Sequence, residues 1–124
     1  MKMLLFIALG GAFGAVLRYA ASSGVYALLG RGFPYGTLFV NVTGSLLIGI
    51  LSIVMLERMH ISAEWRTVVQ VGLLGSFTTF STFSLETLNL LEQGSLATAM
   101  MNIVLSVILC LLAVWLGVLI ARQF

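Results

Sequence analysis

Charged side chains are scarce in this chain of 124 residues. Lysine, arginine, aspartate and glutamate make up 8% of it, whereas a soluble domain typically carries about 25%. Hydrophobic residues make up 60%, and the mean hydropathy is +1.15. So few charges exclude a water-facing surface and predict an integral membrane protein. At about 20 residues per membrane-spanning helix, the length admits four spans and little else.

Cysteine and histidine occur once each, which removes further classes of protein. Cys110 lies in an apolar run and has no partner for a disulfide within the chain, so we expect a small packed hydrophobic residue. His60 has no nucleophile or metal-ligand cluster near it in the sequence, and the chain is therefore not predicted to be an enzyme. The net charge of +2, without a cluster of lysine or arginine, argues against a nucleic-acid partner.

Breaks in the apolar sequence divide it into four segments. Two glycines and the only proline follow the first segment, a polar connector follows the second, and Glu92-Gln93-Gly94 follows the third. The predicted membrane spans cover residues 3–29, 35–56, 67–91 and 95–121. No period-two alternation indicates strands. We therefore predict an all-α membrane protein that forms a single four-helix domain over residues 1–124.

The few basic residues give only a weak preference for one orientation in the membrane. Four spans place both termini and the central connector on one side, with Lys2, Arg58, Arg66 and Arg122, and leave Arg31 on the other. Basic residues favour the cytoplasmic side, so the bias places the N-terminus inside. A bias this small is compatible with insertion in both orientations.

The third segment contains the stretch GSFTTFSTFS at residues 75–84, which is unusually polar for a membrane span. Residues 78–84 include five hydroxyl side chains. One or two such hydroxyls are commonly satisfied by bonding to a carbonyl of the preceding helical turn, but five are too many for this interpretation. Irregular backbone inside a membrane is tolerated where it lines a cavity or is covered by protein. The pattern predicts a helix that is broken near its middle.

Three side chains near this stretch suit a small anion. Asn41 in the second segment either joins helices or offers amide N–H donors to an ion, and the sequence leaves both open. Phe80 and Phe83 are three residues apart and project from one face of a helix, toward lipid or toward the break. Their ring edges are electropositive, so together with the amide they attract an anion without holding it as tightly as a fixed charge would.

Two charged residues and two polar residues within the spans have alternative interpretations. Arg18 either extends toward the membrane surface or supplies a charge that attracts anions at a vestibule. Glu86 lies at the interface or couples to the polar stretch two turns earlier. Asn102 and Ser106 lie one turn apart on one helix face, which more often indicates packing than transport.

Three motifs together resemble the small fluoride channels called Fluc or CrcB. They are GGAFGAVLRY at residues 10–19, GTLFVNVTGS at 36–45 and GSFTTFSTFS at 75–84. The resemblance covers the whole chain and implies a dimer of identical subunits in opposite orientations, with two pores that export fluoride passively. It further implies a multi-pass protein of the bacterial cytoplasmic (inner) membrane.

By position, the resemblance also implies a role for individual residues. Asn41, Phe80 and Phe83 would contact fluoride, Ser81 and Thr82 would continue the polar path, and Glu86 and Arg18 would lie near its ends. A sodium ion at the centre of the dimer would be held by the backbone carbonyls of Gly75 and Thr78. A broken helix exposes carbonyls at the end of its first half, and such carbonyls suit a cation.

Two other functions are compatible with a small four-span membrane protein. A small dual-topology multidrug exporter coupled to protons requires a carboxylate deep in the first span, and this chain has none there. A non-transporting membrane subunit would use the same polar residues only to join helices. The motif match favours the fluoride channel over both.

Overall fold

The protein is described over all 124 residues by a computed structural model, and every regular element is helical. The elements are α1 (Lys2–Leu29), α2 (Tyr35–Ile53), η1 (Val54–Arg58), α3 (Ala63–Thr67), η2 (Val68–Leu74), α4 (Gly75–Phe77), α5 (Phe80–Glu92) and α6 (Leu96–Gln123), where η denotes π-helical turns. Four stretches are long and apolar enough to cross a membrane, namely Lys2–Leu29, Tyr35–Arg58, Ala63–Glu92 and Leu96–Gln123. They correspond to the predicted spans within a few residues at each end.

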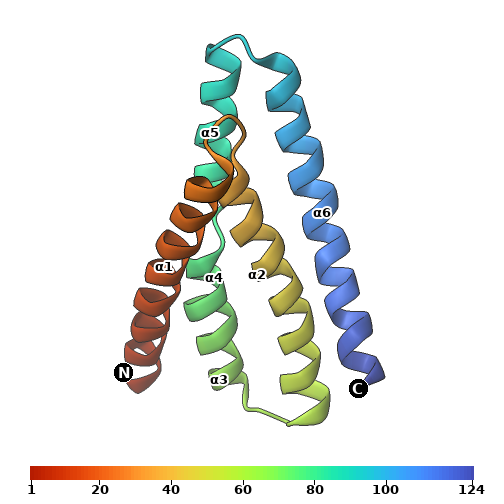
Figure 1. The fold of residues 1–124 in the computed structure, drawn as a ribbon. Coiled ribbons are helices and arrows are strands. Elements are labelled where there is room, and N and C mark those ends of the chain that lie inside the picture. Colours follow the sequence, from red (N-terminus) through yellow and green to blue (C-terminus); the bar gives the residue numbers. More distant parts are fainter.

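The four spans run alternately up and down, so both termini lie at one end of the molecule together with the connector between η1 and α3 (Figure 1). The connectors before α2 and before α6 lie toward the opposite end. α2 runs along α6, whereas α1 packs against α2 and against the first half of the third span. α5, the second half of the third span, packs mainly against α6.

Small residues allow the helix backbones to approach closely where they cross. A Cβ atom added at Gly117 of α6 would lie 3.2 Å from the Cα atom of Gly49 in α2, and at Gly14 of α1 it would lie 3.1 Å from the Cβ atom of Ser76 in α4. Only 21 of the 124 residues are buried, so most apolar side chains point outward. In water this surface would be costly, whereas lipid covers it without penalty.

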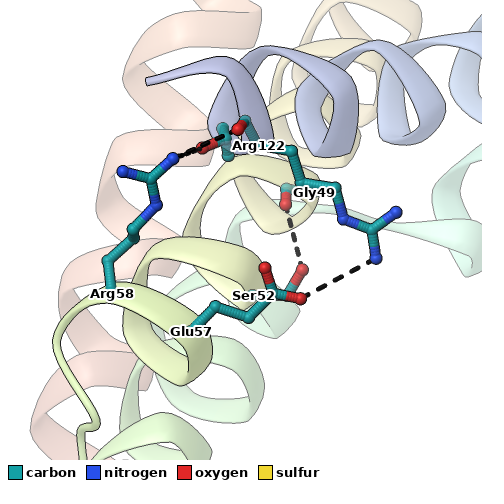
Figure 2. A network of polar contacts seen from close by, with 6 residues as sticks. Gly49, Ser52, Glu57, Arg58 and Arg122 are labelled. Atoms are coloured by element: carbon teal, nitrogen blue, oxygen red, sulfur yellow. Dashed lines mark hydrogen bonds and ion pairs between the residues drawn. The ribbon is translucent and has the colours of Figure 1, made fainter.

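The end of α6 is held by Arg58 of η1, as Figure 2 shows. The guanidinium donates to the backbone oxygens of Ala121 at 3.3 Å and Arg122 at 3.1 Å, and also to that of Phe124. Glu57 forms an ion pair with the Arg122 side chain, with 3.8 Å between the charged atoms (Figure 2). The last carbonyls of a helix lack partners within it, so Arg58 satisfies them and joins the ends of two spans.

Candidate functional site

The third span is broken near its middle, as predicted from the sequence. α4 ends at Phe77, and the next two residues are extended, with φ −89° and ψ 161° at Thr78 and φ −154° and ψ 116° at Thr79. α5 then begins at Phe80. Threonine is a weaker helix former than alanine or leucine, which lowers the cost of interrupting the helix at this pair. The π-helical turns of η2 end at Leu74 and are separated from the break by α4, and such turns are frequent at functional sites.

The polar backbone groups of Thr79 in the break are satisfied by Asn41 of α2. The amide nitrogen of Asn41 donates to the carbonyl of Thr79 at 2.9 Å, and its amide oxygen accepts from the N–H of Thr79 at 2.7 Å. The Thr79 hydroxyl then caps α5 by accepting from the N–H of Thr82 at 3.1 Å. Unpaired backbone groups are costly inside a membrane, so this pair of bonds stabilises the break.

A cavity of about 430 Å³ lies beside the break, between α2, the third span and α6. Its polar and aromatic lining residues are Asn41 and Ser45 of α2, Thr78, Thr79, Phe80 and Phe83 of the third span, and Ser106 of α6. None of its lining residues is charged. The candidate residues Asn41, Phe80 and Phe83 therefore come together around one uncharged space, and Gly75 and Thr78 lie at the same cavity.

Most hydroxyl hydrogens around the cavity are already bonded within the chain. Thr78, Thr79 and Ser106 each donate to another protein group, at 3.0, 3.0 and 3.3 Å. Ser45 makes no hydrogen bond within the chain, and Asn41 keeps a second amide N–H beyond its bond to Thr79. The side-chain groups left for an occupant of the cavity include this amide N–H, the Ser45 hydroxyl and the edges of the two phenylalanine rings.

The two phenylalanines differ in how the subunit surrounds them. Phe83 is buried, with 8% of its surface exposed, whereas Phe80 is 76% exposed. Their ring centroids lie 5.3 Å apart with the planes tilted by 42°, and both rings line the cavity. Ser81 and Thr82 lie on the exposed surface of α5 and do not line this cavity.

Arg18 reaches the break from α1. Its Nη1 atom donates to the carbonyl of Thr78 at 3.4 Å, and its side chain is half-buried. This contact places the guanidinium beside the break in the third span. The carbonyl that accepts from Arg18 belongs to one of the two residues expected to hold sodium.

Glu86 of α5 is bonded to the two helix ends that flank the first connector. Tyr26, in the last turn of α1, donates to the carboxylate at 2.6 Å, and Thr37, in the first turn of α2, donates to its other oxygen. The Arg31 guanidinium lies 4.5 Å from the centre of the Tyr26 ring. Glu86 thus anchors α5 to α1 and α2 and makes no hydrogen bond to the polar stretch before it.

Sequence reasoning did not select four residues that the structure places in or around these contacts. They are Tyr26, Thr37, Ser45 and Thr79. Thr79 carried a usable signal, because a threonine before a helical run is a preferred N-cap. The other three had no spacing signal, since their partners or neighbours come from segments far away in the sequence.

Comparison with known proteins gives a consistent result over nearly the whole chain. The family model described as CrcB-like protein, Camphor Resistance (CrcB), matches residues 5–118. A protein of Methylococcus capsulatus named "Fluoride-specific ion channel FluC" is 58% identical over 99% of this chain, which spans 54% of that protein. Proteins with the same name from Magnetococcus marinus and Coxiella burnetii are 53% and 52% identical, over 94% and 97% of this chain and 94% and 98% of theirs. These names denote an ion channel and not an enzyme, and the chain belongs to the CrcB family.

Proposed function

We propose that this chain forms a fluoride-selective ion channel that lets fluoride leave the cell passively. The proposal draws on the relatives, which are named fluoride-specific ion channels, and on the cavity beside the break in the third span. Neither alternative function has comparable support. The first span carries no carboxylate for a proton-coupled exporter, and the relatives are not named as accessory subunits.

The observation that carries the proposal is an uncharged cavity that still presents groups for an anion. Asn41 offers one amide N–H there, and Phe80 and Phe83 offer electropositive ring edges. Conduction requires an ion to bind well enough to enter and weakly enough to leave. Partial charges meet this requirement, whereas a lysine or arginine in the same place would retain a small anion. Arg18 lies at the break but is not among the residues that line the cavity.

The functional unit in this proposal is a pair of identical subunits in opposite orientations. α5 carries Ser81, Thr82 and Ser84 on its exposed surface, and polar side chains at this depth are costly against lipid. The 76% exposure of Phe80 leaves one ring of the cavity without a cover from its own subunit. A second copy would cover this face and complete two pores. The small imbalance of basic residues between the two ends is compatible with both orientations.

Sodium at the centre of the pair is part of the same proposal. The carbonyls of Gly75 and Thr78 lie at the end of the first half of a broken helix, where the helix dipole favours a cation. The Thr78 carbonyl also accepts from the Arg18 guanidinium at 3.4 Å, so only its second lone pair would be left for the ion. Two carbonyls from each subunit would give four oxygen ligands. A bound ion would supply fixed positive charge between the subunits.

Ion release from liposomes that contain the purified protein tests the proposed function. Vesicles loaded with fluoride or chloride are placed in medium free of both, and ion-selective electrodes measure the release. We expect rapid fluoride release and chloride release no faster than from protein-free vesicles. Equal release of the two ions, or release of neither, would contradict a fluoride channel.

The orientation of the subunits is tested by labelling in intact cells. Single cysteines replace Met59 or Gln93, which are exposed in connectors at opposite ends, in a Cys110→Ser background. If the chain inserts in both orientations, an impermeant thiol reagent added outside the cells labels a fraction of the molecules of each variant. Labelling at only one of the two positions would mean a single orientation and would rule out the antiparallel pair. Separating the inner and outer membranes of the labelled cells, and finding which fraction contains the labelled protein, tests the assignment to the inner membrane.

A further inference from the structure

A chain of hydrogen bonds runs from α6 into the backbone of α5. Ser106 donates to the amide oxygen of Asn102 at 3.3 Å, and the amide nitrogen of Asn102 donates to the hydroxyl of Thr87 at 2.9 Å. Thr87 in turn donates to the carbonyl oxygen of Phe83 at 2.7 Å. Every link has one donor and one acceptor, so the chain is complete from the α6 side chain to the Phe83 backbone.

The central member of this chain is the most enclosed polar side chain of the subunit. Asn102 is 1% exposed, which makes it one of only two large side chains that are fully buried. A buried amide without partners is costly, because it loses its hydrogen bonds to water and gains none. In lipid no water is available to replace the partner that Thr87 provides. The position of Thr87 relative to α6 is therefore tightly specified.

α5 has few other contacts that could fix its rotation about its own axis. Its only buried residues are Phe83 and Thr87, which lie one turn apart on the same face. Its other faces are mostly exposed within the subunit, and it touches α2 at few points. The bonds at Thr79 and Glu86 join the helix to α2 and to the ends of α1 and α2, and the Asn102–Thr87 bond is its one side-chain hydrogen bond to α6.

We propose that Asn102 is a positioning residue for ion conduction, which sets the rotation of α5 through Thr87 and so holds the Phe83 ring at the cavity. Hydrogen bonds are directional, so the Asn102–Thr87 pair restricts the rotation of α5 about its axis more closely than apolar contacts would. Phe80 follows the same rotation, because it packs against Phe83. This inference rests on the proposed function, since the Phe83 ring matters for conduction only in an ion channel.

The test compares two substitutions at one position with two readouts. Thr87→Val keeps the shape of the side chain and removes the hydroxyl, whereas Thr87→Ser keeps the hydroxyl. Thr43→Val is the matched control, because Thr43 makes no hydrogen bond within the chain and does not line the cavity beside the break. Asn102→Leu removes the same contact from the other side. Fluoride release from liposomes reports on conduction.

The second readout is ¹⁹F NMR of protein grown with 4-fluorophenylalanine, which reports on ring placement independently of conduction. The chain contains eight phenylalanines, and the Phe83 signal is identified by its loss in Phe83→Ile. We expect Thr87→Val and Asn102→Leu to shift this signal and to slow fluoride release by about tenfold, as the loss of one buried partner predicts. Thr87→Ser and Thr43→Val should keep the wild-type signal and rate.

The outcomes separate this proposal from the proposed function. If the wild-type protein conducts and Thr87→Val changes neither readout, the positioning role is overturned. A slow rate with an unmoved Phe83 signal also overturns it, as does a moved signal with a normal rate. If neither Thr87→Val nor Asn102→Leu yields folded protein, the pair supports folding and the proposal is again overturned. A wild-type protein that does not conduct contradicts the channel itself, whatever the spectra show.

Discussion

The two halves of the third span are held in the protein by different forces. The first half, from α3 to α4, packs closely against α1, and at Gly14 a single added Cβ atom would collide with the backbone of Leu73. The second half, α5, makes fewer contacts and is joined to the other spans by hydrogen bonds at Thr79, Glu86 and Thr87. Close packing fixes the first half, and directional bonds fix the second.

This difference places stability and ion contact in separate parts of one span. Backbone contacts between helices depend on shape and tolerate no added atoms. Hydrogen bonds specify an angle, and α5 is the helix that carries both phenylalanine rings of the cavity. We therefore expect changes at the bonds of α5 to alter conduction first and changes in the packed half to alter stability first.

The largest effect is expected for Asn41→Asp, which removes the donor to the Thr79 carbonyl and places a negative charge at the cavity. Fluoride release should slow by about 100-fold, equivalent to about 2.7 kcal/mol, because a buried bond is lost and an anion is repelled. Asn89→Asp makes the same change at an exposed position of α5 and should have little effect. Release near the wild-type rate from Asn41→Asp would show that this amide does not contact the ion path.

Phe80→Ile and Phe83→Ile distinguish ring chemistry from packing. Each removes an electropositive ring edge and keeps an apolar side chain, so each should slow fluoride release by about tenfold. Phe83 is buried within the subunit, so its replacement should also lower the free energy of unfolding by about 1 kcal/mol or more, whereas that of Phe80, which only the proposed partner would cover, should lower it less. Thermal unfolding in detergent, followed by tryptophan fluorescence, measures the second effect. Unchanged release in both variants would mean that the rings only fill space.

Gly14→Ala tests the packed half of the comparison. The added methyl would collide with the backbone of Leu73, so we expect a loss of about 1–3 kcal/mol in stability. Protein that folds should keep the wild-type ratio of fluoride to chloride release. Gly24→Ala is the control on the same helix, because no atom lies within 4 Å of its added Cβ and alanine favours helix. A changed ion ratio in Gly14→Ala would show that the two halves are not separable.

Arg58→Gln should have a smaller effect than the substitutions at Asn41, Phe80, Phe83 and Gly14. It removes the cation that bonds to the last carbonyls of α6, and helix-end interactions of this kind contribute about 1 kcal/mol. The midpoint of thermal unfolding should fall by a few degrees with no change in fluoride release. Arg122→Gln removes only an exposed ion pair and should change the midpoint less. If the midpoint falls further for Arg122→Gln than for Arg58→Gln, the stabilising charge at the end of α6 comes from Arg122 and not from Arg58.

The sequence was sufficient to predict the spans and the break, because both depend on local composition. Apolar runs ended by glycine, proline and charged residues marked the helices, and five hydroxyls within residues 78–84 marked the break. The bonding partners of these side chains were not predictable. Glu86, for example, bonds to Thr37, which is 49 positions away, and to Tyr26, which is 60 positions away. The sequence leaves open whether Asn41 joins helices or offers N–H donors to an ion; in the structure it joins α2 to the break and also lines the cavity.

Other features depend on three-dimensional packing that no spacing reveals. The spacing of Asn102 and Ser106 favours packing over transport without naming a partner, and the hydrogen bond from Asn102 to Thr87 appears only when α5 lies against α6. The π-helical turns of η1 and η2 have no marker in the sequence, since they arise where the helix accommodates an extra residue. In the sequence, Arg58 is an ordinary charged residue next to a connector. Its bond to the Ala121 carbonyl is visible only in the structure, where the end of α6 lies beside it.

The most direct test of this account compares Phe80→Ile with Gly14→Ala in one liposome experiment that measures fluoride and chloride release. Phe80 is suited to this test because it is exposed in the subunit, so a lost rate cannot be attributed to a weakened subunit core. We expect slow fluoride release from Phe80→Ile and a wild-type fluoride-to-chloride ratio from folded Gly14→Ala. If Phe80→Ile releases fluoride at the wild-type rate and Gly14→Ala changes the ratio of fluoride to chloride release, the proposed division between the two halves of the third span is wrong.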